Sequence, residues 1–366
     1  MLFPIKMKEN RVWRLYYGGK LIDRLCGSGS GEDANFPENW LASVVVADNP
    51  DRPGKPADEG LSKVDGGEHD GMSLRELILS DPERYLGRAH VAAFGANFGV
   101  LTKFLDSAER LPIQVHPTKQ AAKELFHSDY GKTESWYILD GRRIDGEEPY
   151  ILLGFKKPVS KAIWKELFEK QDIDGMQEYM HKIPVKKGDV YLIAGGTPHA
   201  IGSGCLLLEV QEPTDYTISV EKCDLRGNLM PDHLCHMGLG FDKMFDCFTY
   251  EAMSLDKLKS RYALRPAVTE QQEGGTAETL ITYADTPCFG LDRVRVTGEM
   301  TRKSTGRACC LAVVSGCGVI EAADGRSVAV KSGDCLFKPA ECAELTIRST
   351  GEDTLEILEC LPPEIK

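Results

Sequence analysis

The chain has 366 residues, 42% of them hydrophobic, and a formal net charge of −12. This length is enough to bury one large core or two smaller ones. The excess of carboxylates argues against nucleic acid or an anionic membrane surface as the main partner, because both would repel the chain.

The cellular location is predicted from what the sequence lacks. Its first residues contain no apolar segment of the kind found in signal peptides, and no apolar run approaches the length of a membrane span. The twelve cysteines include no C-x-x-C pair and lie mostly in apolar surroundings, so we expect reduced core residues. Together these features predict a cytoplasmic protein.

The first hundred residues predict short β segments, loops and one capped helix. Residues 48–71 are rich in Pro, Gly and Asp and indicate a surface loop. The following Ser73–Glu76 has the form of a capping box, which predicts the start of a helix. Residues 98–105 then predict a strand with Lys103 embedded in it, as an edge-strand lysine whose head reaches water.

The segment from Leu111 to Leu139 carries polar residues at informative spacings. Gln114 and His116 are two apart in a short apolar run, so on a strand they project from the same face. Pro117 ends that strand because it has no N–H for a ladder. Residues 118–126 predict a short helix, and Glu134 opens a second strand that runs to Leu139.

A further histidine, His199, closes the segment that begins at Gly188. With Gln114, His116 and Glu134 it gives an amide oxygen, a carboxylate and two imidazoles. Such a set suits a divalent transition metal with open positions for water or substrate. A lone strand histidine is more often a core or surface residue, so the joint pattern carries this prediction.

Between these motifs, residues 158–182 predict a helical insertion packed on the β core. Ile163, Leu167, Phe168, Met176 and Met180 recur at a spacing of three to four, with charges between them. The chain then returns to predicted strands, of which residues 205–211 form the longest apolar one.

From about residue 246 the pattern changes to short predicted strands separated by glycines and charged turns. The segment around Ser332–Ala340 repeats the rhythm of Lys187–Ala194, but no histidine occurs between 237 and 366. We therefore expect a metal-binding domain at 1–245 and a metal-free β domain at 246–366 that serves as a packing partner. Antiparallel jelly rolls of this kind have interiors suited to a ligand cavity.

Two motifs resemble those of known families. The pattern G-x5-A-x-G-x2-H, ending at His199, resembles the second motif of cupins, with Ala194 in the usual proline position. Gln-x-His-Pro from Gln114, followed by Gly-Lys-Thr-Glu ending at Glu134, resembles the metal site of type I mannose-6-phosphate isomerases. The resemblance covers most of the chain and implies a mainly β bicupin: two antiparallel jelly-roll barrels with the helical insertion.

The resemblance also implies a function. The family interconverts mannose 6-phosphate and fructose 6-phosphate, or a related sugar, through a cis-enediol. It implies one divalent metal ion, with zinc expected, on Gln114, His116, Glu134 and His199. A metal can stabilise enediolate oxygens as a Lewis acid, and one base can move the proton between C2 and C1.

Other site residues follow from the same resemblance. Glu209 and Lys132 match family residues close to the metal and are candidates for the catalytic groups, with the base left open between them. Lys103 falls near the family's sugar-phosphate site, which gives it a second interpretation as a substrate-binding residue. The sugar, its phosphorylation and the oligomeric state are left open.

One position departs from the family pattern. The segment from Glu209 aligns with a family segment that ends in an arginine, and here that position holds Ser219. A serine cannot make a bidentate charge-assisted contact to phosphate. An alternative is therefore a catalytically impaired or non-enzymatic sugar-binding cupin. A cupin Fe(II) oxygenase is a further alternative, against which the glutamine ligand and the whole-chain resemblance count.

Overall fold

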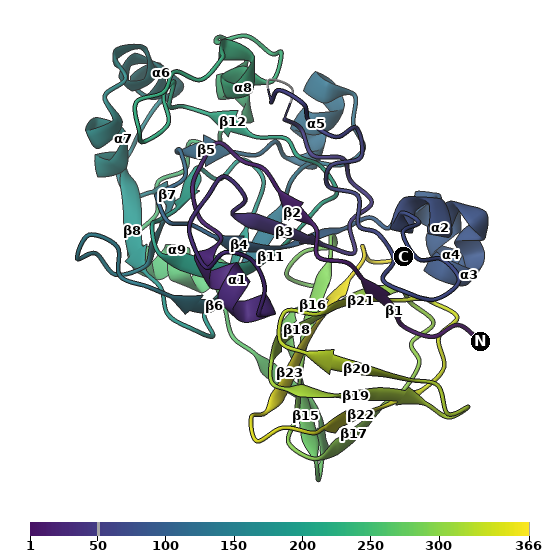
Figure 1. Cartoon of the computed structure of the whole chain (residues 1–366). Coiled ribbons are helices and arrows are strands. Elements are labelled where there is room, and N and C mark those ends of the chain that lie inside the picture. Colours follow the sequence, from purple (N-terminus) through teal and green to yellow (C-terminus); the bar gives the residue numbers. More distant parts are fainter. Residues whose placement is uncertain (50–51, 366) are drawn as a thin grey trace.

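The computed structural model describes residues 1–49 and 52–365, which form two β barrels packed on one another (Figure 1). Residues 50 and 51 of the predicted loop at 48–71 lie outside the described part. Each barrel is built from a seven-stranded sheet and a smaller sheet. Every pairing between the named strands of the described chain is antiparallel, which confirms the predicted mainly β class.

The first barrel combines sheets in the orders β13-β9-β6-β11-β4-β3-β2 and β12-β5-β10-β7-β8. Its strands are β2 (Arg11–Val12), β3 (Glu38–Leu41), β4 (Leu101–Asp106), β5 (Gln114–Val115), β6 (Glu134–Gly141), β7 (Tyr150–Phe155), β8 (Met180–Pro184), β9 (Val190–Ile193), β10 (His199–Ile201), β11 (Cys205–Gln211), β12 (Ile218–Ser219) and β13 (Ala263–Leu264).

The second barrel combines sheets in the orders β1-β21-β18-β23-β16-β15-β14 and β17-β22-β19-β20. Its strands are β1 (Ile5–Met7), β14 (Ala267–Gln272), β15 (Gly275–Ile281), β16 (Gly290–Val296), β17 (Glu299–Arg302), β18 (Cys309–Ser315), β19 (Cys317–Ala322), β20 (Ser327–Lys331), β21 (Cys335–Lys338), β22 (Leu345–Ser349) and β23 (Leu355–Leu361). The N-terminal β1 therefore lies in the sheet of the C-terminal barrel, where Ile5 pairs with Phe337.

Helices fill the connections between strands. They are α1 (Lys20–Cys26), α2 (Leu74–Ser80), α3 (Pro82–Leu86), α4 (Arg88–Phe94), α5 (Lys119–Phe126), α6 (Lys161–Lys170), α7 (Ile173–Tyr179), α8 (Asp232–His236), the 3-10 helix η1 (Met244–Cys247) and α9 (Leu255–Tyr262). The capping box predicted at Ser73 and Glu76 is present at the start of α2. Within the described residues, no helix is long and apolar enough to cross a bilayer.

The predicted helical insertion is present as α6 and α7, with two corrections. Trp164, Phe168 and Met176 are buried against the five-stranded sheet, but Ile163 is 39% exposed because it faces away from that stripe. Met180 is not helical: it begins β8, where it pairs with Phe155. Backbone pairing with the buried strand β7 therefore sets the conformation of Met180, although this residue recurs at helical spacing in the sequence.

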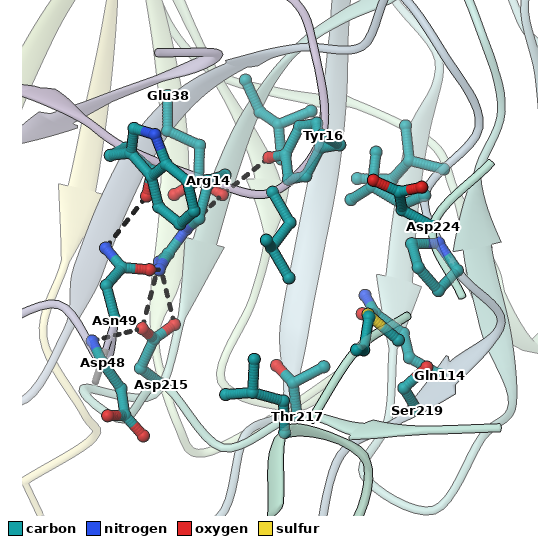
Figure 2. A pocket seen from close by; sticks show the side chains of 18 of the residues that line it. Arg14, Tyr16, Glu38, Asp48, Asn49, Gln114, Asp215, Thr217, Ser219 and Asp224 are labelled. Carbon is teal, nitrogen blue, oxygen red and sulfur yellow. Dashed lines mark hydrogen bonds and ion pairs between the residues drawn. The ribbon is translucent and has the colours of Figure 1, made fainter. Parts of the chain in front are cut away.

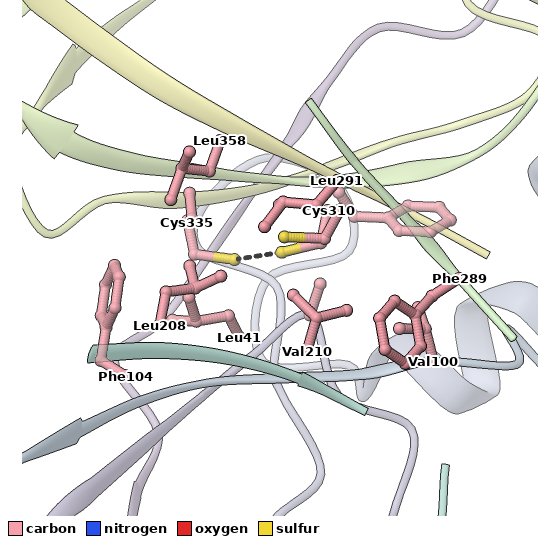
Figure 3. Packing of buried hydrophobic residues seen from close by; sticks show 14 of the residues in the cluster. Leu41, Val100, Phe104, Leu208, Val210, Phe289, Leu291, Cys310, Cys335 and Leu358 are labelled. Atoms are coloured by element: carbon pink, nitrogen blue, oxygen red, sulfur yellow. Dashed lines mark hydrogen bonds between the residues drawn. The ribbon is translucent and has the colours of Figure 1, made fainter. Parts of the chain in front are cut away.

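The outer faces of the two seven-stranded sheets pack together between the barrels (Figure 3). Strand alternation decides which side chains reach this interface. Cys310 contributes to it, whereas the adjacent Cys309 points into the core of the second barrel. On β11, Leu208 reaches the interface and Leu207 the interior of the first barrel. All twelve cysteines are free, as expected.

Candidate active site

Strand pairing brings the predicted ligands to one end of the first barrel. His199 on β10 pairs directly with Gln114 on β5, and Ser219 on β12 pairs with Gln114 from the other side. Glu134 opens β6 in the facing sheet, where it pairs with Gln211. The four residues come from segments up to 85 positions apart, so the barrel's register, and not local sequence, sets their geometry.

Two glycines let the connecting loops approach closely enough. A Cβ at Gly131 would lie 2.7 Å from the Pro117 carbonyl oxygen, and one at Gly195 would lie 2.8 Å from that same atom. Both distances are shorter than real Cβ contacts. The Gly-Lys-Thr-Glu and Ala-Gly-Gly loops thus need glycine at these positions to deliver Glu134 and His199.

The ligand atoms converge on one point. His116 Nε2 lies 3.0 Å from Glu134 Oε2, and His199 Nε2 lies 3.4 Å from Glu134 Oε1. The Gln114 amide is 3.3 Å from His199 Nε2. The ammonium of Lys132 lies beside them, 2.8 Å from His116 Nε2 and 3.1 Å from Glu134 Oε2.

The protonation pattern of this cluster fits a metal ion. His116 donates its Nδ1–H to the Tyr216 carbonyl, and His199 donates its Nδ1–H to the Thr197 carbonyl, which leaves both Nε2 lone pairs facing inward. Both oxygens of the buried Glu134 lack a hydrogen-bond donor in good geometry. Four acceptor atoms that face one another, with the Lys132 ammonium beside two of them, suit a further cation between them. Rotating the Gln114 amide would place its oxygen inward as well.

Burial and charge keep the cluster in the ligating protonation states. Burial and the nearby Lys132 ammonium lower the pKa of His116 to about 3, so its imidazole is neutral at physiological pH. Burial also lowers the pKa of His199. Burial pushes the pKa of Glu134 upward, but the Lys132 ammonium holds it well below its ordinary value. The carboxylate is therefore charged and the imidazoles are free to bind a cation.

A cavity of about 250 Å³ borders this cluster and is lined by Gln114, Lys132, Glu209, Lys103 and Ser219 among others (Figure 2). Lys103 Nζ lies 3.0 Å from Glu209 Oε1. Burial raises the pKa of Glu209, although Lys103 opposes the shift. The cavity therefore holds a buried carboxylate with a raised pKa, close to the cluster of His116, Glu134 and His199.

The prediction that Lys103 is an edge-strand lysine is wrong. It lies on β4 between β3 and β11, and only 3% of it is exposed. Glu38 and Glu209, on those two strands, pair with its ammonium group. This pairing replaces the solvation that water would give to a lysine at a sheet edge.

Comparisons with known proteins agree with this geometry. A model of the type I phosphomannose isomerase catalytic domain matches residues 56–137. The probable mannose-6-phosphate isomerase GmuF of Bacillus subtilis is 28% identical over 298 residues, covering 80% of this chain and 84% of the relative. The chain is a relative of the type I mannose-6-phosphate isomerases. This confirms the predicted family and, with it, the expected class of enzyme, an aldose–ketose isomerase.

Further similar proteins cover three quarters of the chain or more. A mannose-6-phosphate isomerase of Streptococcus mutans is 28% identical over 76% of this chain and 79% of its own. The crystal structure of the Bacillus subtilis mannose 6-phosphate isomerase superposes with a TM-score of 0.76 at 25% identity, covering 98% of this chain and 99% of that one. A zinc-bound mannose 6-phosphate isomerase has the same fold at 15% identity, with a TM-score of 0.72 over 99% of this chain and all of the other.

Several charged residues of the cavity escaped the sequence analysis. Arg14 places Nη2 3.0 Å from both carboxylate oxygens of Asp215 and Nε 3.1 Å from Glu38. Arg110 forms a second bidentate pair with Glu221, at 2.6 and 2.9 Å. A charged residue inside an apolar, β-like segment is the sequence signal that drew attention to Lys103. Arg14 carries the same signal and could have been found in the same way.

Ser219 lines the cavity, yet its hydroxyl is committed to its own turn. It donates to the Glu221 carbonyl at 3.1 Å and accepts from the Glu221 N–H at 3.2 Å. The next two cations along the described chain do not line the cavity. Lys222 packs on the rings of Phe168 and Phe241. Arg226 packs on Tyr17 and pairs with Asp224.

Proposed function

We propose that the protein is a metal-dependent aldose–ketose isomerase that interconverts mannose 6-phosphate and fructose 6-phosphate, or a related sugar, through a cis-enediol. The observation that carries the proposal is the convergence of His116, Glu134 and His199 on one point, with Gln114 beside them, at the wall of a sugar-sized cavity. The names of the similar proteins support the choice of the mannose–fructose pair.

Gln114, His116, Glu134 and His199 would hold one divalent ion, zinc in this proposal. When bound, it would supply Lewis-acid stabilisation for the oxygens of the enediolate. The neutral imidazoles and the charged Glu134 are already in the protonation states that such an ion requires. The Nδ1–H groups of His116 and His199 donate to backbone carbonyls, and these hydrogen bonds fix the ring orientations before the ion arrives.

Glu209 is the base in this proposal. Its carboxylate is buried at the cavity wall, and its raised pKa brings it closer to the working pH of a proton-transfer group. It would take the proton from C2 and return it to C1 of the enediol. Lys103 holds that carboxylate in place at 3.0 Å, so Lys103 is a positioning residue.

Lys132 would serve the sugar oxygens. Its ammonium lies between the cavity and the cluster and can donate a hydrogen bond to a carbonyl or enediol oxygen. That donor would favour the charge that develops on oxygen as the C2 proton leaves.

A coupled assay on purified protein tests the proposal. With mannose 6-phosphate and mannose as substrates, we expect isomerase activity that disappears after chelation and returns when zinc is added back. Elemental analysis should give one divalent ion per chain. Loss of the metal without any change in isomerase rate would contradict the proposal.

A second candidate is a sugar-binding protein with impaired catalysis. The observation that favours it is Ser219, whose hydroxyl is bound to the Glu221 backbone and supplies no charge to the cavity. Sugar binding by the metal-loaded protein without turnover of either substrate would select this candidate.

A further inference from the structure

The cations that line the cavity are all paired with carboxylates. Within the described residues, the lining includes five of them: Arg14, Arg52, Lys103, Arg110 and Lys132. The same lining includes six carboxylates: Glu38, Asp48, Glu109, Glu209, Asp215 and Asp224. The wall of the cavity therefore carries one more negative than positive side chain, although a sugar phosphate is a dianion near neutral pH.

Arg14 illustrates how fully these cations are committed. It faces Asp215 with one arm, Glu38 with its Nε, and donates from Nη1 to Asn49 at 3.2 Å. Figure 2 shows this group on the side of the cavity opposite Gln114 and Ser219. No free edge of the guanidinium is left for a bidentate contact with phosphate.

The other arginines follow the same rule. Arg110 uses Nη1 and Nη2 on Glu221, and Glu221 also accepts the Ile113 N–H at 2.6 Å, so the carboxylate is fixed in place. Arg52 at the rim pairs with Glu59 and packs on the rings of Trp13 and Phe36. An incoming dianion would have to displace these carboxylates or lie against them, and both cost binding free energy.

The two lysines are committed to catalytic groups. Lys103 lies 3.0 Å from Glu209 and 3.8 Å from Glu38, and Lys132 lies 3.1 Å from Glu134. A divalent ion held by Glu134 would add positive charge, but at the end of the cavity where the C1–C2 oxygens must lie. The phosphate of a hexose 6-phosphate is carried on C6, at the other end of the sugar.

We infer that this cavity takes an unphosphorylated aldose or ketose in preference to its 6-phosphate. The inference rests on the proposed function and narrows its substrate. Paired cations and carboxylates present both donors and acceptors, which matches hydroxyl groups that are themselves both. Trp13 and Tyr16 add ring surface for the apolar face of a sugar. The volume of about 250 Å³ is below the roughly 300–1,000 Å³ usual for larger ligands.

The test compares kcat/KM of the zinc-loaded protein for mannose and for mannose 6-phosphate. We expect the value for mannose to equal or exceed that for the phosphate. A higher value for mannose 6-phosphate overturns the inference while leaving the isomerase function intact. If neither sugar is turned over, the isomerase function fails, and calorimetric titration with the two sugars decides the inference. Tighter binding of mannose supports it. Tighter binding of mannose 6-phosphate, or no binding of either sugar, overturns it.

Variants sharpen the comparison. Ser219→Arg adds a cation to the cavity lining and should raise the ratio of kcat/KM for mannose 6-phosphate over mannose by roughly ten- to a hundredfold, the worth of one charge-assisted contact. Thr217→Arg, at a half-buried lining position, makes the same test if the first variant does not fold. An unchanged ratio in every folded arginine variant overturns the inference.

Arg52→Gln tests the group that would have to hold a phosphate if the inference were wrong. Among the described residues, Arg52 pairs with one carboxylate, that of Glu59, and it lines the cavity. We expect this change to affect both sugars alike, with the ratio of the two kcat/KM values kept. A selective loss on mannose 6-phosphate overturns the inference.

Discussion

The two barrels share a frame and differ in what fills one end of it. Each has a seven-stranded sheet facing a smaller one, and each has an apolar core. In the first barrel the strand β9 is followed by Ala194, two glycines and, three residues later, His199. In the second, β21 is followed by Pro339 and Ala340, and the N–H of Ala340 bonds to the Tyr85 carbonyl on α3. The same sequence pattern forms a barrel strand in both halves of the chain. A catalytic site also requires imidazole side chains and loops that approach one another closely.

The difference in charge is equally clear. The first barrel buries many charged or polar groups at one end, namely Lys103, Glu209, Glu38, His116, Glu134 and His199. Holding such charges is costly unless each has a partner, so the first barrel needs a rigid frame. We propose that the second barrel supplies it by covering the back of the first barrel's large sheet.

The largest expected effect comes from removing the second barrel. A chain that ends after residue 245 exposes Phe104 and Leu208 at the interface and loses Met253, Leu258 and Tyr262 from the first barrel's core. We expect it to be insoluble or to melt without cooperativity, as measured by circular dichroism. A chain that ends after residue 265 keeps α9 and β13 and separates the two causes. Cooperative melting and full activity of the shorter chain would contradict the packing role.

The second effect concerns the metal. His116→Ala removes one of the two inward-facing lone pairs, so metal content should fall sharply. Isomerase activity should fall by more than about a hundredfold, since even partners of metal ligands are worth roughly ten- to a hundredfold. His181→Ala is the matched control, because this buried histidine bonds to the Met253 carbonyl away from the cluster. Elemental analysis that finds full occupancy in His116→Ala would remove the basis for this site.

The third effect is a shift in pH dependence. Glu209 must be charged to act as a base, so activity falls as the pH drops through its pKa, which burial raises above the ordinary 4.5. Lys103 opposes that rise. Lys103→Met should therefore move the acid limb of the kcat/KM profile to higher pH and lower the rate at pH values on that limb. Lys338→Met, at the buried lysine of β21, is the control and should leave the profile in place.

The smallest effect is on stability and involves Asp106 at the end of β4. Burial raises its pKa to about 6, although its Oδ2 accepts the N–H groups of Gly19 and Leu21. The folded state then binds more protons than the unfolded state between about pH 4 and 6, so stability falls as pH rises through that window. Asp106→Asn should remove this pH dependence of the free energy of unfolding, which amounts to on the order of 1–3 kcal/mol across the window. Urea unfolding at several pH values measures it, with exposed Asp140→Asn as control, and an unchanged slope would refute the assignment.

Sequence reasoning reached much of this structure because local patterns determine it. The capping-box pattern placed the start of α2 at Ser73, and two short motifs picked out residues that converge in space. It failed for Lys103, because the carboxylates that allow its burial come from strands 65 residues before it and 106 after it. It missed Arg14 for the same reason. Burial of a charge depends on partners that only the sheet register assembles.

The position of β1 has a consequence for how the chain is made. Ile5 leaves the ribosome about 330 residues before its partner Phe337. At the usual synthesis rates this interval is roughly 15–65 s, during which the strand lacks its ladder partner β21. The nascent first barrel can assemble in that time, but the second sheet stays incomplete until β21 emerges. Chaperones that bind short extended apolar segments therefore have a window in which the leading end of this chain is open to them.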